Sequence, residues 1–477
     1  MLPKSRRLIL QSGLSAASIL AFPNAMHAAS KFATPKNTQN VQWIGQQENK
    51  TLHTTENIRT RLSPKLRTLC QNGDGVRQAV EFAQETKTPF ALRSGGHCFE
   101  GLSQNENLII DLRHMNRIEI SQNRRRIRVQ PGATLGQIND ATSRMQAALP
   151  AGFCQSVGIG GHVGGGGMGL MSRQFGLACD HLHSAQIVMA DGRLLTASNE
   201  QNADLFWALR GGGSGSLGVV TEFEFNLRHV ANVSLFTMIW ALTAKEGAKF
   251  LEAWQVWSQS NPNSIGAVLT VKNHSSDKLF FRSMMLSTGA DQETKAAAQE
   301  LFSFANPMQS PSIHQGSYGE VADVIWPQRA LPARSYKSAS DFISAPLLAP
   351  IWQNMLERML ASKIGRQTFI IDALAGQIGT LRNDETAYAH RDNVNFLLQY
   401  EALTGNSETR DHDVVDMRAI KHTLADHVTG GAYVNYPDSD LGDWPRAYWG
   451  SNLARLQSVK RKYDPDNFFT HAQSIPR

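Results

Sequence analysis

The chain has 477 residues, of which 41% are hydrophobic, and a formal net charge of +6. A chain of this length buries a large core and favours two domains over one, and it contains no apolar run long enough to span a bilayer. The small charge and the lack of a basic helix with interleaved aromatic residues argue against a protein that binds nucleic acid.

The first 30 residues have the order of an export signal. Lys4, Arg6 and Arg7 precede a small-residue apolar segment over residues 12–22, and an alanine-rich stretch follows. The adjacent arginines resemble a twin-arginine signal, which belongs to a route that carries folded protein and would allow a cofactor to be loaded first. We therefore expect a periplasmic or secreted protein; the alternative is a disordered basic N-terminus.

Cysteine and histidine spacing predicts neither a disulfide framework nor a metal site. The chain has four cysteines: Cys70, Cys98, Cys154 and Cys179. They form no C-x-x-C pair, and four are too few to hold so long a chain together. Asp180, His181 and His183 could be taken for metal ligands, but histidines near the start of a strand are more often structural. We predict no metal.

The first half of the chain alternates short strands and helices with glycine-rich loops between them. Hydrophobic spacing predicts helices over residues 74–86, 134–147 and 203–209. Strands are predicted over residues 89–93, 108–112, 117–120, 126–129, 185–190, 194–197 and 218–227. The loops over residues 93–98, 150–180 and 211–216 are rich in glycine.

The longest of these loops, residues 150–180, has the backbone of a ligand-binding loop. Its glycines offer N–H groups that no side chain shields, and concave arrays of such groups bind anions. Single residues such as Cys154 and His162 interrupt the run, which is not the composition of a linker. One G-x-G-x-x-G match from Gly164 to Gly169 is weak evidence for NAD, because no β-branched strand precedes it. The run can still cradle the diphosphate of a nucleotide.

Beyond Arg228 the glycine density falls and longer elements follow. Strands are predicted over residues 233–241, 265–271, 279–286, 369–373 and 395–403, and helices over residues 244–259, 293–304, 350–361 and 411–428. This alternation is typical of an α+β domain built on an antiparallel sheet.

An ordered set of motifs spans nearly the whole chain after residue 30. The set comprises Arg93-Ser94-Gly95-Gly96-His97, Cys154 ahead of residues 157–162, residues 215–220, Tyr433-Val434-Asn435-Tyr436-Pro437-Asp438, residues 448–456, residues 462–465 and residues 473–476. Together these motifs resemble the berberine-bridge-enzyme-like branch of FAD-linked oxidases.

The resemblance implies an α+β fold with two parts. One is a two-lobed FAD-binding domain of the p-cresol methylhydroxylase or vanillyl-alcohol-oxidase type, and the other is an α+β substrate domain with an antiparallel sheet. We expect the export signal at residues 1–30, the FAD-binding domain at 55–230, the substrate domain at 231–431, and a C-terminal segment at 432–477 that returns to the flavin.

The resemblance also implies a flavin held by two covalent bonds, from His97 to the 8α-methyl carbon and from Cys154 to C6. A neutral imidazole and a thiolate are the protein nucleophiles best able to add to an electron-poor isoalloxazine. Cys98 stands where the family usually has serine. The other predicted flavin-binding residues are Arg93, Ser94, Gly95, Gly96, Val157, Gly158, Gly160, Gly161, His162, Gly165, Gly166, Gly218, Val219, Val220, Tyr436 and Asn452.

Tyr436 stands at the position of a tyrosine that, by the family resemblance, acts as the catalytic base in many members. A phenol with a pKa near 10 is a poor base at neutral pH, so this role needs a partner or a positive field that lowers its pKa. The alternative is that Tyr436 packs on the flavin as an aromatic wall. Glu401 and Asp372 are the carboxylates to which the base role falls if Tyr436 does not perform it.

The strand over residues 395–403 is expected to face the substrate, since Leu397, Gln399 and Glu401 share one face at period two. Some relatives place a catalytic carboxylate on this strand, but here Leu397 and Gln399 occupy the positions where it is expected. Gln399 is therefore predicted to hydrogen-bond a polar substrate.

The preferred hypothesis is a monomeric flavin oxidase that acts on a hydroxyl or hemiacetal of a small polar substrate, such as a mono- or oligosaccharide. Val157 resembles the position where a small side chain leaves room for molecular oxygen, so hydrogen peroxide is the expected second product. The alternatives are a dehydrogenase with another electron acceptor, an oxidative tailoring enzyme of secondary metabolism, an NAD(P)-dependent reductase and a non-catalytic binding protein.

Overall fold

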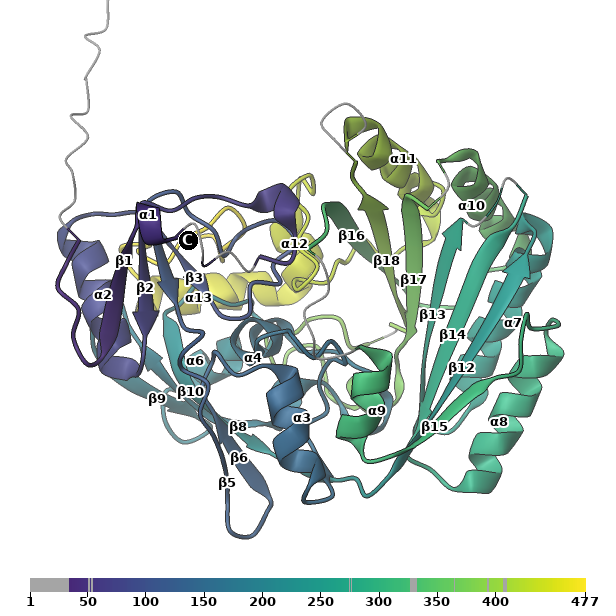
Figure 1. Ribbon diagram of the computed structural model, residues 1–477, viewed down its shortest axis with the longest axis horizontal. Coiled ribbons are helices and arrows are strands. Elements are labelled where there is room, and N and C mark those ends of the chain that lie inside the picture. Colours follow the sequence, from purple (N-terminus) through teal and green to yellow (C-terminus); the bar gives the residue numbers. More distant parts are fainter. Residues whose placement is uncertain are drawn as a thin grey trace, which may run out of the picture. The chain divides into compact units, whose positions relative to one another are not determined.

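The computed structural model describes residues 34–49, 52, 55–273, 275, 277–326, 333–363, 365–392, 394–405 and 410–477. Residues 1–30, the predicted export signal, lie outside the described residues. Lys36–Arg477 forms one compact unit (Figure 1). No helix within the described ranges is both long enough and apolar enough to cross a membrane.

A four-stranded sheet begins this unit, in the order β1-β2-β4-β3. Its strands are β1 Val41–Gly45, β2 Leu66–Cys70, β3 Phe90–Arg93 and β4 Leu108–Asp111. Because β2 and β3 both pair with β4 in parallel, the chain needs a crossover, and helix α2 (Gly73–Glu85) supplies it. Val76, Ala79, Val80 and Ala83 of α2 recur at helical spacing and pack into the hydrophobic cluster of this sheet.

Five antiparallel strands form the second sheet, in the order β5-β6-β10-β8-β9. They are β5 Ile118–Ile120, β6 Arg126–Val129, β8 Leu182–Val188, β9 Leu194–Ser198 and β10 Val219–Asn226. Helices α3 (Leu135–Ser143) and α6 (Ala203–Leu209) share the hydrophobic cluster of this sheet. A capping box between Thr134 and Gln137 begins α3.

Helix α3 ends four residues earlier than hydrophobic spacing predicts. Gln146 takes a left-handed φ of 52°, which ends helical geometry. The next residues form the short strand β7 (Ala147–Ala148), which pairs with β11 (Arg228–His229).

The third sheet is built from residues 233–403 and has seven antiparallel strands in the order β15-β12-β14-β13-β17-β18-β16. The strands are β12 Val233–Leu242, β13 Ile265–Asn273, β14 Leu279–Ser287, β15 Ser312–Gly316, β16 Tyr336–Ile343, β17 Gln367–Ala373 and β18 Phe396–Leu403. Helices α7 (Ala244–Ser260), α8 (Asp291–Ser303), α10 (Ala349–Ala361) and α11 (Arg410–His422) cover one face, and α9 (Tyr318–Ile325) lies on the other side (Figure 1).

Alternate residues of the central strands face opposite sides of this sheet. On β13, Ala267, Leu269 and Val271 belong to the hydrophobic cluster under the helices, whereas Val268, Thr270 and Lys272 line a cavity. The same division holds on the next two strands, where Phe369, Ile371, Leu398 and Tyr400 face the helices and Thr368, Ile370, Gln399 and Glu401 line the cavity. One face is thus part of the core, and the other is free to carry polar groups.

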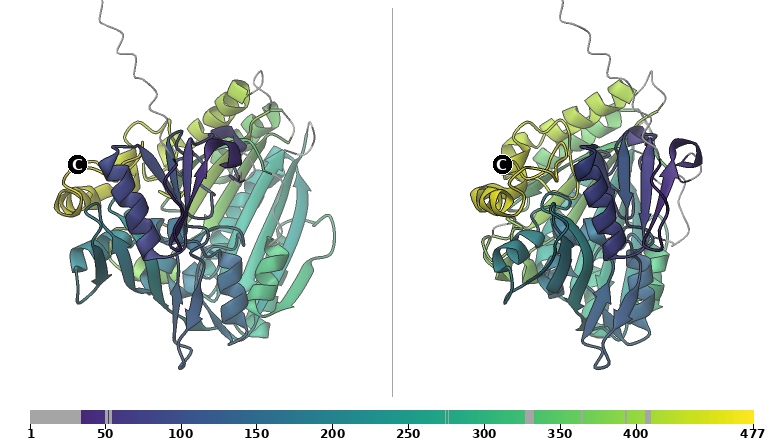
Figure 2. Two further views of the ribbon diagram at one scale, coloured as in Figure 1. Left: turned by 60° about the vertical axis from the view of Figure 1, so that its left-hand side comes forward. Right: turned by 90° about the vertical axis from the view of Figure 1, so that its left-hand side faces the viewer.

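The C-terminal segment packs back on the first two sheets through α12 (Trp444–Trp449) and α13 (Leu453–Tyr463), yellow in Figures 1 and 2. The side chain of Lys460 on α13 is fully buried and lies 2.6 Å from Asp464. Its Nζ also donates hydrogen bonds of 2.7 Å to the carbonyls of Ser216 and Phe469. One ammonium therefore holds α13, the glycine loop around Ser216 and the end of the chain together.

The Lys460–Asp464 pair generates a stability prediction. We expect Lys460→Ala to lower the free energy of unfolding by about 3–5 kcal/mol, because the substitution leaves a buried carboxylate without its partner. Lys462→Ala is the matched control, since Lys462 lies on the same helix and pairs with Asp204 at the exposed surface. Urea unfolding measures both; equal midpoints for the two variants would contradict the prediction.

Candidate functional site

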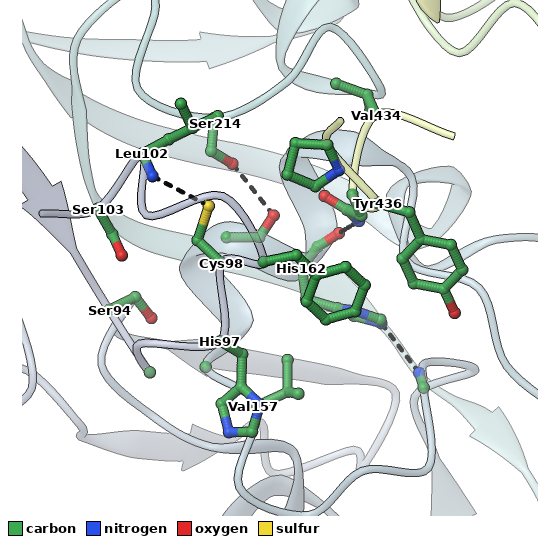
Figure 3. Close-up of a pocket in the computed structure, with 18 of the residues that line it drawn as sticks. Ser94, His97, Cys98, Leu102, Ser103, Val157, His162, Ser214, Val434 and Tyr436 are labelled. Atoms are coloured by element: carbon green, nitrogen blue, oxygen red, sulfur yellow. Dashed lines mark hydrogen bonds between the residues drawn. The ribbon is translucent and has the colours of Figure 1, made fainter. Parts of the chain in front are cut away.

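A cavity of about 530 Å³ lies between the glycine-rich loops and the polar face of the seven-stranded sheet. Its volume falls in the range of about 300–1,000 Å³ that is usual for ligand sites. Residues 93–99, 157–162 and 213–220 line one side, and β13, β14, β17 and β18 line the other. Residues 433–437 of the C-terminal segment complete the wall. Figure 3 shows part of this lining.

Two glycine loops meet backbone to backbone at one wall of the cavity. A Cβ on Gly95 would lie 2.3 Å from the backbone nitrogen of Gly158, and a Cβ on Gly158 would lie 2.1 Å from Oγ of Ser94. Ser94 Oγ donates a 2.6 Å hydrogen bond to the carbonyl of Pro131. The two loops can approach this closely only because both positions lack a side chain.

The loop over residues 94–97 rests on a buried cluster of charges. The side chain of Arg93 is 2% exposed and lies 3.4 Å from Asp111, which also binds Arg67 and Arg113 at 2.6 Å. A Cβ on Gly96 would lie 2.3 Å from the Arg93 guanidinium, so the backbone lies directly on that group. Arg93 thus supports the loop, and it shares the carboxylate of Asp111 with Arg67 and Arg113.

Gly161 shows where this wall has room for a ligand. A Cβ built at this position meets no atom within 4 Å, although the residue lines the cavity. Elsewhere in the same run a Cβ would meet backbone, as at Gly160, where it would lie 2.9 Å from the carbonyl of Pro131. The open approach to bare backbone at Gly161 fits a large planar or phosphate-bearing group.

His97 and Cys154 line the cavity, and each of them contacts Ser156. The Cys154 sulfur lies 3.8 Å from Oγ of Ser156, and the His97 ring bonds the Ser156 backbone. Burial lowers the pKa of the His97 imidazole, so its nitrogen lone pair is free at neutral pH. Burial also raises the pKa of the Cys154 thiol, which favours the protonated form. The two side chains therefore share one stretch of the wall, where the neutral imidazole can act as a nucleophile and the thiol must first lose its proton.

Cys98, beside His97, performs a local structural task. Its sulfur accepts a hydrogen bond from the backbone N–H of Leu102 at 3.3 Å (Figure 3). Burial raises the pKa of this thiol. A serine at this position can accept the same hydrogen bond. This accounts for a cysteine at position 98, where the family usually has serine.

Tyr436 stands in the cavity wall between two other rings. It stacks on Phe99 with ring centroids 5.2 Å apart and meets Tyr433 edge-on at 5.0 Å. Burial, followed by the charge of Asp372, raises the pKa of the Tyr436 phenol well above its usual value of 10. The base role requires the opposite shift, so this geometry favours the wall interpretation of Tyr436.

Asp372 on β17 has a pKa that suits a general base better than that of Tyr436. By the alternation of the strand it lies on the same face as Thr368 and Ile370, which line the cavity, although Asp372 is not itself part of the lining; it pairs in register with Val268 and Leu397. Burial raises the pKa of its carboxyl to about 7. Within the described part of the chain, its side chain has neither a hydrogen bond nor an ion pair.

The face of β18 is divided as the alternating pattern predicts. Gln399 and Glu401 line the cavity, and Leu397 packs into the hydrophobic cluster of the five-stranded sheet. Gln399 donates a 3.2 Å hydrogen bond to Oγ of Ser338. Glu401 lies 3.2 Å from Arg334, and burial raises the pKa of its carboxyl. The amide of Gln399 is therefore fixed by the sheet beside it, and Glu401 already has a cationic partner.

Most of the residues predicted from the sequence line this one cavity. They are Arg93, Ser94, Gly95, Gly96, His97, Cys154, Val157, Gly158, Gly160, Gly161, His162, Gly218, Val219, Val220, Gln399 and Tyr436. His162 accepts a 2.9 Å hydrogen bond from the backbone N–H of Gly152, and burial lowers the pKa of its imidazole to about 4. This ring is therefore a neutral structural acceptor in the cavity wall.

Three predicted flavin-binding residues lie outside the cavity lining. Gly165 packs against the side-chain amide of Asn435, where a Cβ would lie 2.2 Å from Oδ1. Gly166, at a φ of 118°, packs against the ring of Tyr388. Asn452 donates to the carbonyls of residues 383, 386 and 387 at 2.6–3.4 Å. All three hold neighbouring loops in place and do not face the cavity.

Several polar residues of the cavity were not predicted from the sequence: Glu56, Thr270, Lys272, Arg282, Arg334 and Thr368. Thr270 and Lys272 alternate with buried apolar residues on a strand whose position was predicted. Their alternation with apolar residues shows that they share one face of the sheet. The sequence does not show whether the helices cover that face or leave it open.

Two family models match the chain, one described as FAD binding domain over residues 64–198 and one described as berberine and berberine like over residues 432–476. Both matched domains, the relatives and the solved structures make the chain similar to the berberine-bridge-enzyme-like FAD-linked oxidoreductases. The fold class and the FAD cofactor predicted from the sequence are thus confirmed. The bare backbone around Gly161 and the neutral His97 fit such a cofactor.

Relatives of this family cover nearly all of the chain. The FAD-linked oxidoreductase YgaK of Bacillus subtilis is 29% identical over 428 residues, which is 89% of this chain and 93% of the relative. Berberine bridge enzyme-like 4 of Arabidopsis thaliana is 29% identical over 448 residues, with 84% of this chain and 82% of the relative covered. The solved structure of BBE-like 1 from Physcomitrella patens matches with a TM-score of 0.84 at 26% identity, covering 91% of this chain and 97% of that one.

The space at Gly161 generates a prediction about cofactor binding. We expect Gly161→Ala to have the melting temperature of flavin-free wild-type protein, since the methyl group meets no protein atom within 4 Å, but to lose FAD because the methyl group enters the cavity. Flavin absorbance per protein measures the loss. Gly442→Ala is the control, because it also meets no atom within 4 Å and does not line the cavity. Full flavin content in both variants would place the cofactor elsewhere.

Proposed function

We propose that this oxidoreductase is an oxidase whose FAD is bound covalently through His97 and Cys154. Its substrate carries a hydroxyl or hemiacetal on a polar framework, and molecular oxygen is reduced to hydrogen peroxide. The observation that supports the two bonds is the placement of both side chains in the cavity wall, where each contacts Ser156. A flavin tied at two points stays bound in a cavity open to bulky substrates.

The sheet face opposite the glycine loops supports a polar substrate. It offers the hydroxyls of Thr270 and Thr368 and the amide of Gln399, all of which line the cavity. Polar groups placed on strands of a rigid sheet are well suited to hold substrate hydroxyls in one orientation.

FAD, when bound, supplies the acceptor for the hydride that leaves the carbon of the substrate. The chain must then remove the hydroxyl proton, and we assign this task to Asp372, whose charge acts on the Tyr436 phenol in the cavity wall although its own side chain is not part of the lining. Its pKa of about 7 lies close to the operating pH, where a general base is most effective. Tyr436, which stays protonated, can donate a hydrogen bond to the substrate oxygen and shield it from water. A dehydrogenase with another electron acceptor is the alternative, and the yield of peroxide in air separates the two.

The covalent bonds can be tested on denatured protein. We expect acid-precipitated wild-type protein to keep its yellow colour, because covalent bonds survive loss of the fold. His97→Ala and Cys154→Ala should each retain flavin after precipitation, and the double variant should release it. Cys98→Ser is the control, because it removes the neighbouring thiol and should leave the linkage unchanged. Release of all the flavin from wild-type protein would rule out both anchors.

The base assignment predicts a pH dependence of flavin reduction by substrate. Asp372 must be deprotonated to accept a proton, so the rate should rise with pH through about 7 and then level off. Asp372→Asn should slow reduction by about 10²–10⁴-fold and abolish the rise. Tyr436→Phe should keep the rise, since the carboxylate is still present. Stopped-flow reduction without oxygen measures both; loss of the rise in Tyr436→Phe alone would return the base role to the tyrosine.

A further inference from the structure

The cavity wall carries two cations that the proposed proton transfer does not use. Lys272 on β13 and Arg282 on β14 both line the cavity, and Arg282 is half-buried there. In the described ranges, no carboxylate forms an ion pair with either side chain, and neither makes a side-chain hydrogen bond. Both groups are therefore available to a ligand.

Strand register places these two cations on one patch of the sheet. Arg282 pairs directly with Thr270, and Lys272 pairs with Phe280 on one side and Thr368 on the other. Lys272 and Arg282 are thus diagonal neighbours on the same face, roughly 7–8 Å apart at the backbone. The hydroxyls of Thr270 and Thr368 lie beside them in the cavity lining.

Of the acidic groups that the structure describes around this patch, none forms an ion pair with it. Glu401 lies in the row of Lys272 and has its ion pair with Arg334, which also binds Glu56; Lys272 acts on Glu401 only as a nearby positive charge. Asp372 lies in the row on the other side of Thr270, and burial raises the pKa of its carboxyl. Arg282 is half-buried without an ion-pair partner in the described chain, and burial lowers the pKa of its guanidinium, so its placement costs stability in the free protein. A bound anion would remove that cost.

We propose that the substrate of this cavity carries an oxyacid group, a carboxylate or a phosphate ester, which Arg282 and Lys272 bind together while Thr270 and Thr368 contact its hydroxyls. This assignment rests on the proposed function, because it names the class of hydroxyl compound that the oxidase takes. The planar guanidinium of Arg282 matches two oxygens of such a group, and Lys272 adds a second charge. The preferred substrate is then an acidic sugar or an acidic polyol.

The test measures binding to the holoenzyme separately from oxidation. Calorimetric titration without oxygen, on enzyme whose flavin has first been reduced chemically so that it can accept no hydride, compares glucuronate with its neutral methyl ester, and glucose 6-phosphate with glucose. We expect an acidic member of these pairs to bind at least tenfold more tightly than its neutral partner. Arg282→Gln and Lys272→Gln should each weaken that binding by roughly 10–100-fold, as expected for a lost hydrogen bond to a charged group, and should leave the neutral partner unchanged.

Lys278→Gln is the matched control, because Lys278 lies on the same hairpin, carries the same charge and does not line the cavity. It should bind the acids as the wild type does. Equal affinity for acid and neutral partner, or equal loss in Lys278→Gln, would overturn the oxyacid site even if neutral sugars are oxidised. Tight, Arg282-dependent binding of an acid without flavin reduction would retain the site and reject the proposed oxidase. Which pair shows the dependence identifies carboxylate or phosphate.

Discussion

The contact between Gly95 and Gly158 is the constraint on which the cofactor wall depends. A side chain at either position would collide with the backbone of the other loop. His97 follows Gly95 by two residues, and Cys154 precedes Gly158 by four, so this crossing of two main chains sets how far apart the two nucleophiles can lie. The buried Arg93–Asp111 cluster beneath Gly96 holds the first loop rigidly from behind.

The seven-stranded sheet must be apolar on the face that packs against the helices and polar on the face that lines the cavity. Its period of two made most strands predictable: β12, β13, β14, β17 and β18 lie where the alternation of apolar residues placed them. β16 was missed because Lys337, Ser338, Ser340 and Asp341 interrupt its apolar pattern, although all four are buried. Their partners, such as Glu100 for Lys337 and Lys421 for Asp341, are distant in sequence, and local pattern cannot reveal them.

Some residues of the site can be predicted from local sequence, and others cannot. The loops that carry His97 and Cys154 can be recognised by their glycine content, and in the structure both residues line one cavity. Arg282 gives no local signal, because its role depends on strand register and on which face of the sheet the helices leave open. The pKa of Tyr436 likewise depends on rings and a carboxylate from other segments. Asn452 lies in one of the motifs that resemble the family, yet its side-chain amide donates a hydrogen bond to a backbone carbonyl of a neighbouring loop.

The junction made by Lys460 has a consequence for how the enzyme matures. Residues 433–437 and 470–473 line the same cavity as His97, and Lys460 fastens this segment to the loop at Ser216. During synthesis, the wall around the flavin is therefore still incomplete after the whole seven-stranded sheet has left the ribosome. Capture of the cofactor must be a late event, in which the last stretch of chain closes over a pocket that earlier segments have prepared.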